Sequence, residues 1–164
     1  MRDDNEILPY VQHLYAEHRR LHRLIQDARH AILLHVRTPG KTMADQVLPP
    51  LHLVRDELAR HFAEEEREGC LEQAVSYCPQ ISPEVTRITG EHAAILTEMD
   101  RLIAQAQDNL ESVAEDVELK NAFNALCDTI HRHEVAENKL LRRGFGMLAD
   151  DDENGWAREA MTTG

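Results

Sequence analysis

The sequence is poor in the residues and patterns that mark several large classes of protein. Aromatic residues make up only 4% of its 164 residues, while Leu, Ala, Glu, Arg and Gln are plentiful, which favours helices over strands. No run of apolar residues is long enough to span a bilayer, and the opening MRDDNEILPY contains no apolar signal-peptide core. A glycine-rich phosphate loop, a G-x-S-x-G motif and a dinucleotide fingerprint are also missing from the sequence. We therefore expect a helical protein without a membrane-spanning segment.

Paired cysteines and an excess of basic residues are absent as well. Cys70, Cys78 and Cys127 are odd in number and form no CxxC pair, which is typical of reduced thiols in a cytoplasmic protein. The formal net charge is −12, from 18 basic and 30 acidic residues with histidine neutral. Because so acidic a surface repels nucleic acid and anionic lipid, we expect a cytoplasmic protein that binds neither nucleic acid nor membrane.

Four stretches carry apolar residues at helical spacing, and breaker residues separate them. We expect helices over about residues 5–37, 42–69 (kinked at Pro49-Pro50), 82–107 and from about 116 to Gly144 or Gly146, with a helical turn at 70–80. Ser82 is expected to be the N-cap of the third helix, because Pro83 and Glu84 follow it. The fold class predicted is all-α: an up-down-up-down antiparallel four-helix bundle over residues 1–146, followed by an acidic tail over 147–164.

Two of the expected helices contain histidine and glutamate at the same spacing. The segments are His61-Phe-Ala-Glu-Glu65 and His133-Glu-Val-Ala-Glu137, and residues four apart lie one turn apart on one helix face. Both pairs continue the apolar stripes of their helices and therefore occupy core positions. Burying an imidazole and a carboxylate together is costly unless something satisfies them, and a metal ion would do so.

The other two long helices each supply one histidine on the apolar stripe, His18 and His92. The order His18, His61 and Glu65 is therefore repeated as His92, His133 and Glu137, with the histidines of each half 43 (18 to 61) and 41 (92 to 133) residues apart. In antiparallel neighbours, equal distances from the shared loop give equal height, so all four histidines should lie in one layer.

The remaining histidines serve as an internal control for this assignment. The five that fall about 100–180° from the ligand face are expected to face solvent; they are His13, His30, His35, His52 and His131. Only His22, one turn after His18, shares a ligand face.

The combined pattern resembles the hemerythrin-like family of HHE cation-binding domains, and the resemblance covers about residues 8–145. The family motif is a His on the first helix, H-x-x-x-E on the second, a His on the third and H-x-x-x-E or a longer-spaced acid on the fourth. The resemblance implies two non-haem irons with an oxo or hydroxo bridge. The ligands that it implies are His18 and His61 on one iron, His92 and His133 on the other, and Glu65 and Glu137 as bridges.

Ligand chemistry agrees with this choice of metal. Imidazole and carboxylate suit iron or manganese, with zinc as a further substitute, and no cysteine lies on a ligand stripe to attract softer metals. None of the four histidines has a Glu three residues before it, which argues against the ferritin-like branch of carboxylate bundles.

The sequence departs from the oxygen-carrying hemerythrins at one position. Their third helix has a second histidine one turn after the first, where this chain has Leu96. His22 is the counterpart of that missing residue, and two roles for it stay open. It either gives a fifth nitrogen to the His18 iron, which leaves the open site on the other iron, or lies beside the ligands as a partly buried neighbour.

The apolar residues expected around the centre predict a small, dry pocket that admits O₂, NO or peroxide but no large substrate; they are Leu14, Ile25, Leu58, Ile95, Met99 and Ile130. We therefore expect a protein that binds such small ligands for sensing, storage or detoxification. The alternatives are an iron-handling or iron–sulfur-repair protein under oxidative or nitrosative stress, and a di-iron peroxidase or NO reductase. Repair proteins of that type usually carry an additional cysteine-bearing domain, which this sequence lacks. The sequence does not distinguish a monomer from a homodimer.

Overall fold

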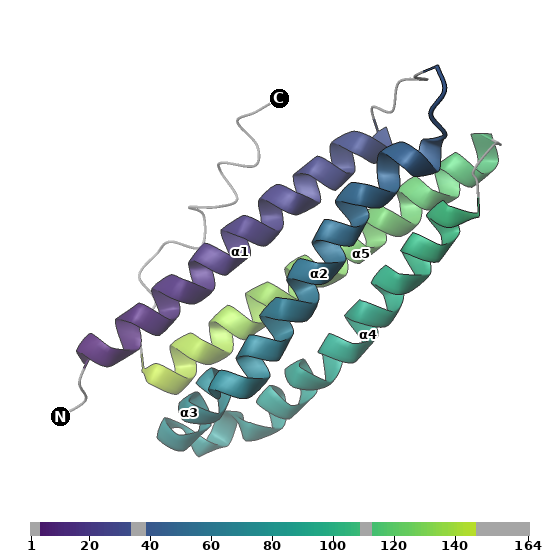
Figure 1. Cartoon of the computed structure of the whole chain (residues 1–164). Helices are drawn as coiled ribbons and strands as arrows, with labels where there is room; N and C mark the ends of the chain where they lie inside the picture. The colour runs from purple at the N-terminus through teal and green to yellow at the C-terminus, as the bar shows by residue number, and fades with distance from the viewer. Residues whose placement is uncertain (1–3, 34–38, 109–112, 147–164) are drawn as a thin grey trace.

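Four long helices lie side by side in the computed structural model, which describes residues 4–33, 39–108 and 113–146 (Figure 1). They are α1 (Asp4–Leu33), α2 (Met43–Glu68), α4 (Ser82–Gln107) and α5 (Val113–Phe145). A short helix, α3 (Cys70–Tyr77), and a 3₁₀ turn, η1 (Pro79–Ile81), connect α2 to α4. Helix α1 packs on α2 and α5, and α4 packs on α2 and α5. The prediction of an all-helical protein is confirmed for these residues.

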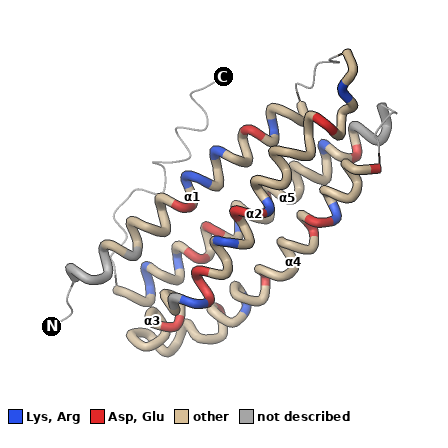
Figure 2. Tube along the Cα trace, viewed as in Figure 1, with Lys and Arg blue, Asp and Glu red and all other residues tan. Residues whose placement is uncertain are grey.

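Two features of the surface bear on the sequence-based expectations. None of the helices in the described ranges has a segment long and apolar enough to cross a membrane. Lys and Arg are interspersed with Asp and Glu along the helices and do not collect on one helix (Figure 2). The predicted acidic tail, 147–164, and His35 lie outside the described residues.

The beginning and end of α2 have the local interactions that its sequence predicts. Thr42 is the N-cap: its Oγ1 accepts from the Asp45 backbone N–H at 3.1 Å, while the Asp45 carboxylate accepts from the Thr42 N–H at 2.8 Å. The helix runs without interruption through Pro49 and Pro50 and ends at Gly69, whose φ of 65° suits a residue without a Cβ.

Two predicted helix boundaries are wrong, each for a structural reason. Ser82 is not an N-cap, because η1 leads directly into α4; Ser82 already has helical φ and ψ (−52° and −45°), and Ile81 takes the cap position. Helix α5 begins at Val113, inside the stretch 108–115 that was expected to be a linker. The strong helix formers Ala114 and Glu115 account for the earlier start.

Helix α5 also continues through Gly144, which is buried against α3, and ends only before Gly146 (φ 65°). A Cβ placed on Gly144 would lie 2.5 Å from Cβ of Ala74 and 3.0 Å from Cδ1 of Ile81. Gly144 is therefore a close-packing position between α5 and α3, and it does not end the helix.

A layer of buried polar side chains divides the apolar core in two. One cluster spans α1, α2, α4 and α5 on one side of the layer and includes Leu21, Leu58, Ile95 and Ile130. The other lies toward α3 and includes Leu14, Leu71, Ile88 and Leu140. Nine buried polar or charged residues are found between α1, α2, α4 and α5: Glu17, His18, Glu57, His61, Glu65, His92, His133, Glu134 and Glu137.

Replacement of the two helical glycines by alanine should change stability in opposite directions. Gly144→Ala should lower the free energy of unfolding by about 1–3 kcal/mol, because the added methyl overlaps Ala74. Gly90→Ala in α4 should raise it by up to about 1 kcal/mol, because a Cβ there meets no atom within 4 Å and alanine favours helix. Urea denaturation followed by circular dichroism measures both; a Gly144→Ala protein as stable as wild type would contradict the close packing of α5 on α3.

Candidate metal centre

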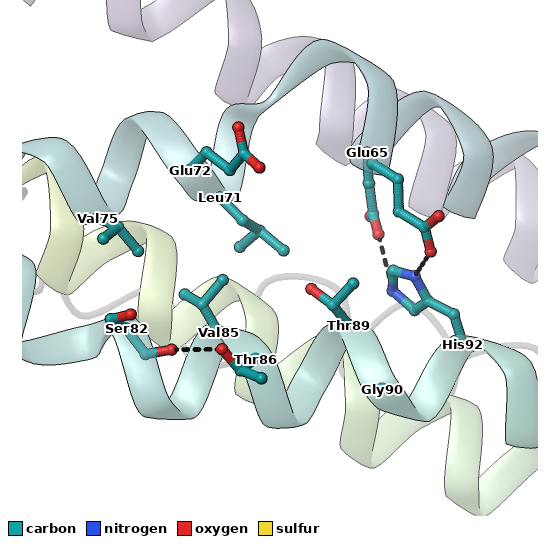
Figure 3. A pocket seen from close by; sticks show the side chains of 11 residues that line it. Glu65, Leu71, Glu72, Val75, Ser82, Val85, Thr86, Thr89, Gly90 and His92 are labelled. Carbon is teal, nitrogen blue, oxygen red and sulfur yellow. Dashed lines mark hydrogen bonds and ion pairs between the residues drawn. The ribbon is translucent and has the colours of Figure 1, made fainter.

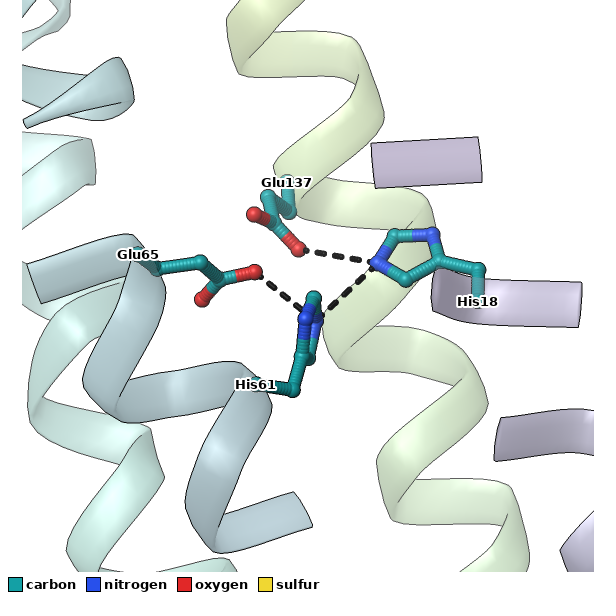
Figure 4. A group of neighbouring side chains, drawn as sticks. All are labelled: His18, His61, Glu65 and Glu137. Carbon is teal, nitrogen blue, oxygen red and sulfur yellow. Dashed lines mark hydrogen bonds and ion pairs between the residues drawn. The ribbon is translucent and has the colours of Figure 1, made fainter. Parts of the chain in front are cut away.

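The first part of the centre is a group of four buried side chains from α1, α2 and α5 (Figure 4). Nε2 of His18 lies 3.2 Å from Nε2 of His61, and Nε2 of His61 lies 2.8 Å from Oε1 of Glu65. Oε2 of Glu137 lies 3.5 Å from Nε2 of His18. The four side chains thus direct a nitrogen or oxygen atom toward a common point, as metal ligands do.

The second part of the centre consists of Glu65, His92 and His133, from α2, α4 and α5. Oε2 of Glu65 lies 3.2 Å from Nε2 of His92, so the two oxygens of this carboxylate face different histidine pairs. The ring centroids of His92 and His133 are 5.0 Å apart at an interplanar angle of 71°, nearly matching 5.0 Å and 80° for His18 and His61. The structure therefore brings the histidines together in the two predicted pairs, with Glu65 between them. Glu137 approaches the His18 pair.

Three of the four histidines have their other ring nitrogen held by a carboxylate. Nδ1 of His61 lies 3.1 Å from Glu17, Nδ1 of His92 lies 2.9 Å from Glu66, and Nδ1 of His133 lies 2.9 Å from Glu91. Such a contact fixes the ring and, in the neutral imidazole, favours the tautomer with the proton on Nδ1, which leaves the lone pair of Nε2 facing the centre. This carboxylate–histidine arrangement is the one found behind metal-ligating histidines.

His22 belongs to neither ligand group among the described residues. Its Nε2 lies 2.6 Å from Oε2 of Glu134, a buried carboxylate that directly follows His133 in α5. The hydrogen bond to Glu134 is the main cause of a raised pKa of His22, against the effect of partial burial. The structure thus places His22 beside the ligands, hydrogen-bonded to Glu134.

Phe62 directly follows His61 in α2, just as Glu134 directly follows His133 in α5. Its ring stacks on His92 with centroids 4.0 Å apart and an interplanar angle of 6°, and it lies 5.4 Å from the ring of His133. The environment of the centre is therefore asymmetric: an aromatic ring covers the His92 pair, whereas the carboxylate of Glu134 lies near the His18 pair.

The pKa values of the four histidines diverge according to their partners. Burial lowers the pKa of His18 to about 4, and burial also lowers the pKa of His133. For His61 and His92 burial acts in the same direction, but their carboxylate contacts, above all with Glu65, outweigh it and raise the pKa.

The two buried carboxyls next to these rings have pKa values shifted in opposite directions. Burial opposes ionisation of Glu65, yet its contacts with His61 and His92 lower its pKa overall. Burial, together with the negative charge of Glu65, raises the pKa of Glu137 well above its usual range. The two carboxyls of Glu65 and Glu137 together thus retain one proton, which a bound metal cation would displace.

Several buried atoms of the centre have no hydrogen-bond partner among the described residues. They are both carboxylate oxygens of Glu65, Oε2 of Glu137, and Nε2 of His92 and of His133. The contacts of Glu65 with the imidazoles are short, but they do not have the angles of hydrogen bonds. Unsatisfied buried polar atoms are rare in folded proteins, and a set of them converging from three helices, α2, α4 and α5, fits a cation.

A further group of three potential ligands, His13, Glu17 and Glu64, lies at the surface next to the centre. The side chain of His13 is 59% exposed, as expected for a histidine off the ligand face. The Arg60 guanidinium lies 2.8 Å from Glu17 and 2.6 Å from Glu64, so a cation already neutralises both carboxylates. This group is therefore a weaker candidate for a metal than the buried centre. His30, His52 and His131 are also exposed, as predicted.

Two cavities reach the centre from different sides. The smaller has a volume of about 30 Å³ and is lined by residues including Leu14, Cys70, Glu65 and Glu137. The larger, about 560 Å³, extends from Glu65 and His92 along α3 and α4 (Figure 3). The expectation that the centre adjoins only a small apolar pocket is therefore wrong, because α3 and α4 leave a wide groove on the His92 side.

Sequence reasoning did not assign roles to Glu17, Glu66, Glu91, Glu134 or Phe62. The repeated dipeptides Glu17-His18 and Glu91-His92 were a usable signal, since each glutamate holds the histidine of the neighbouring helix in its own half. No comparable repeat marks the other three. Comparison with known proteins adds no assignment, because no protein-family model, curated protein or solved structure matches the chain.

The stability of the metal-free and metal-loaded protein should respond to pH in opposite ways. In the metal-free chain the pKa values of Glu137, His61, His92 and His22 are raised, so the folded state holds more protons than the unfolded state above about pH 6.5. Its free energy of unfolding should therefore fall as the pH rises above about 6.5. Stabilisation by metal should rise over the same range, since metal ions bind deprotonated ligands.

Urea titrations at each pH, with and without chelator, measure both trends. The Glu137→Gln variant, which cannot hold the extra proton, should show a shallower decline when metal-free. A metal-free wild type that gains stability toward about pH 9 would contradict the assigned proton distribution.

Proposed function

We propose that this chain is a hemerythrin-like protein that holds two non-haem iron ions and binds a small ligand such as O₂, NO or peroxide. His18 and His61 would bind one iron and His92 and His133 the other, with Glu65 and Glu137 between them. The observation that carries the proposal is the convergence of inward-facing Nε2 atoms and unpartnered carboxylate oxygens in one buried layer. A pair of redox-active irons would supply an open coordination position for the ligand.

The surrounding residues prepare the centre for such ions. Glu17, Glu66 and Glu91 hold three imidazoles with Nε2 directed inward, which reduces the entropy lost when a metal binds. Glu65 and Glu137 contribute the negative charge that neutralises the cations. The apolar clusters on either side lower the local dielectric constant and strengthen these electrostatic interactions.

The size of the smaller cavity supports a small ligand. About 30 Å³ accommodates a molecule of the size of water, O₂ or NO, and the cavity adjoins Glu65 and Glu137. The antiparallel up-down-up-down topology is part of the proposal, and the order of colours along the helices in Figure 1 supports it.

Metal content should depend on His133 and not on its exposed neighbour. Protein purified from iron-supplemented cells should contain about two irons per chain, and His133→Ala should lose at least one of them. His131→Ala is the matched control, because this histidine lies on the same helix but is exposed. Elemental analysis measures the metal, and circular dichroism verifies that both variants remain helical. Less than one metal per wild-type chain would overturn the proposal.

Ligand binding should appear as a reversible change in the optical spectrum of the iron protein. The reduced or oxidised protein is first kept under argon. Addition of O₂, NO or peroxide should then produce a stable absorption band, which should disappear when the ligand is removed. The physical reason is that the cavities beside Glu65, Glu137 and His92 would let a small molecule reach metals held by the buried donor set. Rapid catalytic loss of peroxide without a stable band would instead identify an enzyme.

A further inference from the structure

A groove beside the centre is far larger than a diatomic ligand requires. It has a volume of about 560 Å³, which is within the range of sites for small organic molecules. Its walls come from α3 and the first half of α4, and its inner end is formed by Glu65 and His92 (Figure 3). Any molecule lying in the groove would thus reach the carboxylate shared by the two histidine pairs.

The inner end of the groove offers buried polar atoms that lack partners. Glu65 is 8% exposed and His92 is 3% exposed, and neither the Glu65 oxygens nor Nε2 of His92 has a hydrogen-bond partner in the described chain. Nδ1 of His92 is held by Glu66, which also lines the groove, so the ring is oriented by one of the groove's own carboxylates.

The walls combine apolar surface with negative charge. Leu71 and Val85 provide buried apolar contacts, Thr86 and Thr89 carry hydroxyls, and Glu66 and Glu72 add carboxylates. Lys and Arg are absent from the described residues that line the groove. The groove therefore repels carboxylate and phosphate ligands and attracts a cation that also has an apolar part.

We propose that this groove binds a small organic ammonium ion, with its alkyl part against Leu71 and Val85 and its charged end among the carboxylates. The part of this proposal that places the bound molecule next to a metal ion rests on the function proposed above. The groove would make this side of the centre a site for an organic substrate or effector, while the smaller cavity beside Glu137 serves the small ligand.

Gly90 makes the groove testable without disturbing the helix. It lines the groove from α4, it has no unusual φ, and a Cβ built on it meets nothing within 4 Å. A leucine at this position should occupy part of the groove and leave the backbone unchanged. Ala94 is a matched control, since it is an exposed position one turn further along the same helix.

Calorimetric titration of the purified protein with three probes of equal length tests the proposal: hexylammonium, 1-hexanol and hexanoate. Hexylammonium should bind at least about tenfold more tightly than hexanoate, because the carboxylates of Glu66 and Glu72 on the groove walls attract an ammonium and repel a carboxylate. Gly90→Leu should weaken hexylammonium binding at least about tenfold, whereas Ala94→Leu should leave it unchanged. Metal content should be the same in both variants.

The controls separate the groove from general attraction of cations to an acidic protein. Equal binding of hexylammonium and hexanoate, or binding unaffected by Gly90→Leu, would overturn the proposal. If circular dichroism shows that Gly90→Leu does not fold, Glu72→Gln replaces it and should weaken hexylammonium but not 1-hexanol. A protein with two metals and no Gly90-dependent binding overturns this inference alone, whereas a protein without metal that still binds hexylammonium in the groove overturns the proposed function alone.

Discussion

The free energy of desolvating one polar layer constrains the whole bundle. Nine polar or charged side chains are buried among the residues that the structure describes, and transfer of each ion from water opposes folding by several kcal/mol unless it is compensated. Part of the compensation is visible in the carboxylate–imidazole contacts and in the single proton that Glu65 and Glu137 retain. Five of the unpartnered atoms belong to Glu65, Glu137, His92 and His133, the residues of the two candidate ligand groups. A cation bound between them would satisfy these atoms together, which no rearrangement of the surrounding apolar residues can do.

Repetition along the chain explains how one layer receives ligands from four helices. In each half a glutamate–histidine dipeptide on one helix faces a histidine on the next: Glu17 contacts His61, and Glu91 contacts His133. The halves then diverge at the residue that follows the second histidine. Phe62 stacks on an imidazole, whereas Glu134 receives His22. The two sides of the centre therefore differ in polarity although their ligand residues match.

The same divergence appears one turn after the first histidine of each half. His22 stands where the other half has Leu96, and Glu134 where it has Phe62, so two hydrogen-bonded polar residues correspond to two apolar ones. Partly buried Leu96 packs against the core. A ligand approaching the centre would thus meet a hydrogen-bonding surface near His18 and an aromatic surface near His92, so the two histidine pairs have unequal environments.

The sequence was sufficient for the parts of the structure that depend on helical periodicity. Four apolar stripes predict the long helices, and the position of His61 and His133 on two of them predicts the layer in which the four histidines meet. Periodicity does not report on contacts between elements. Glu66 is off the apolar stripe of α2 and became a partner of His92 only through the packing of α2 on α4. In the sequence, Gly144 resembles a helix terminator. Its close contact with Ala74 depends on the placement of α3, which helical periodicity does not predict.

The placement of α3 also determines what the centre can reach. Helices α3 and α4 together form the walls of the groove, with Leu71 of α3 and Val85 of α4 among the residues that line it. Both cavities end at Glu65, the residue whose two oxygens face different histidine pairs. One carboxylate would then be the meeting point of a small ligand arriving beside Glu137 and an organic molecule arriving beside His92.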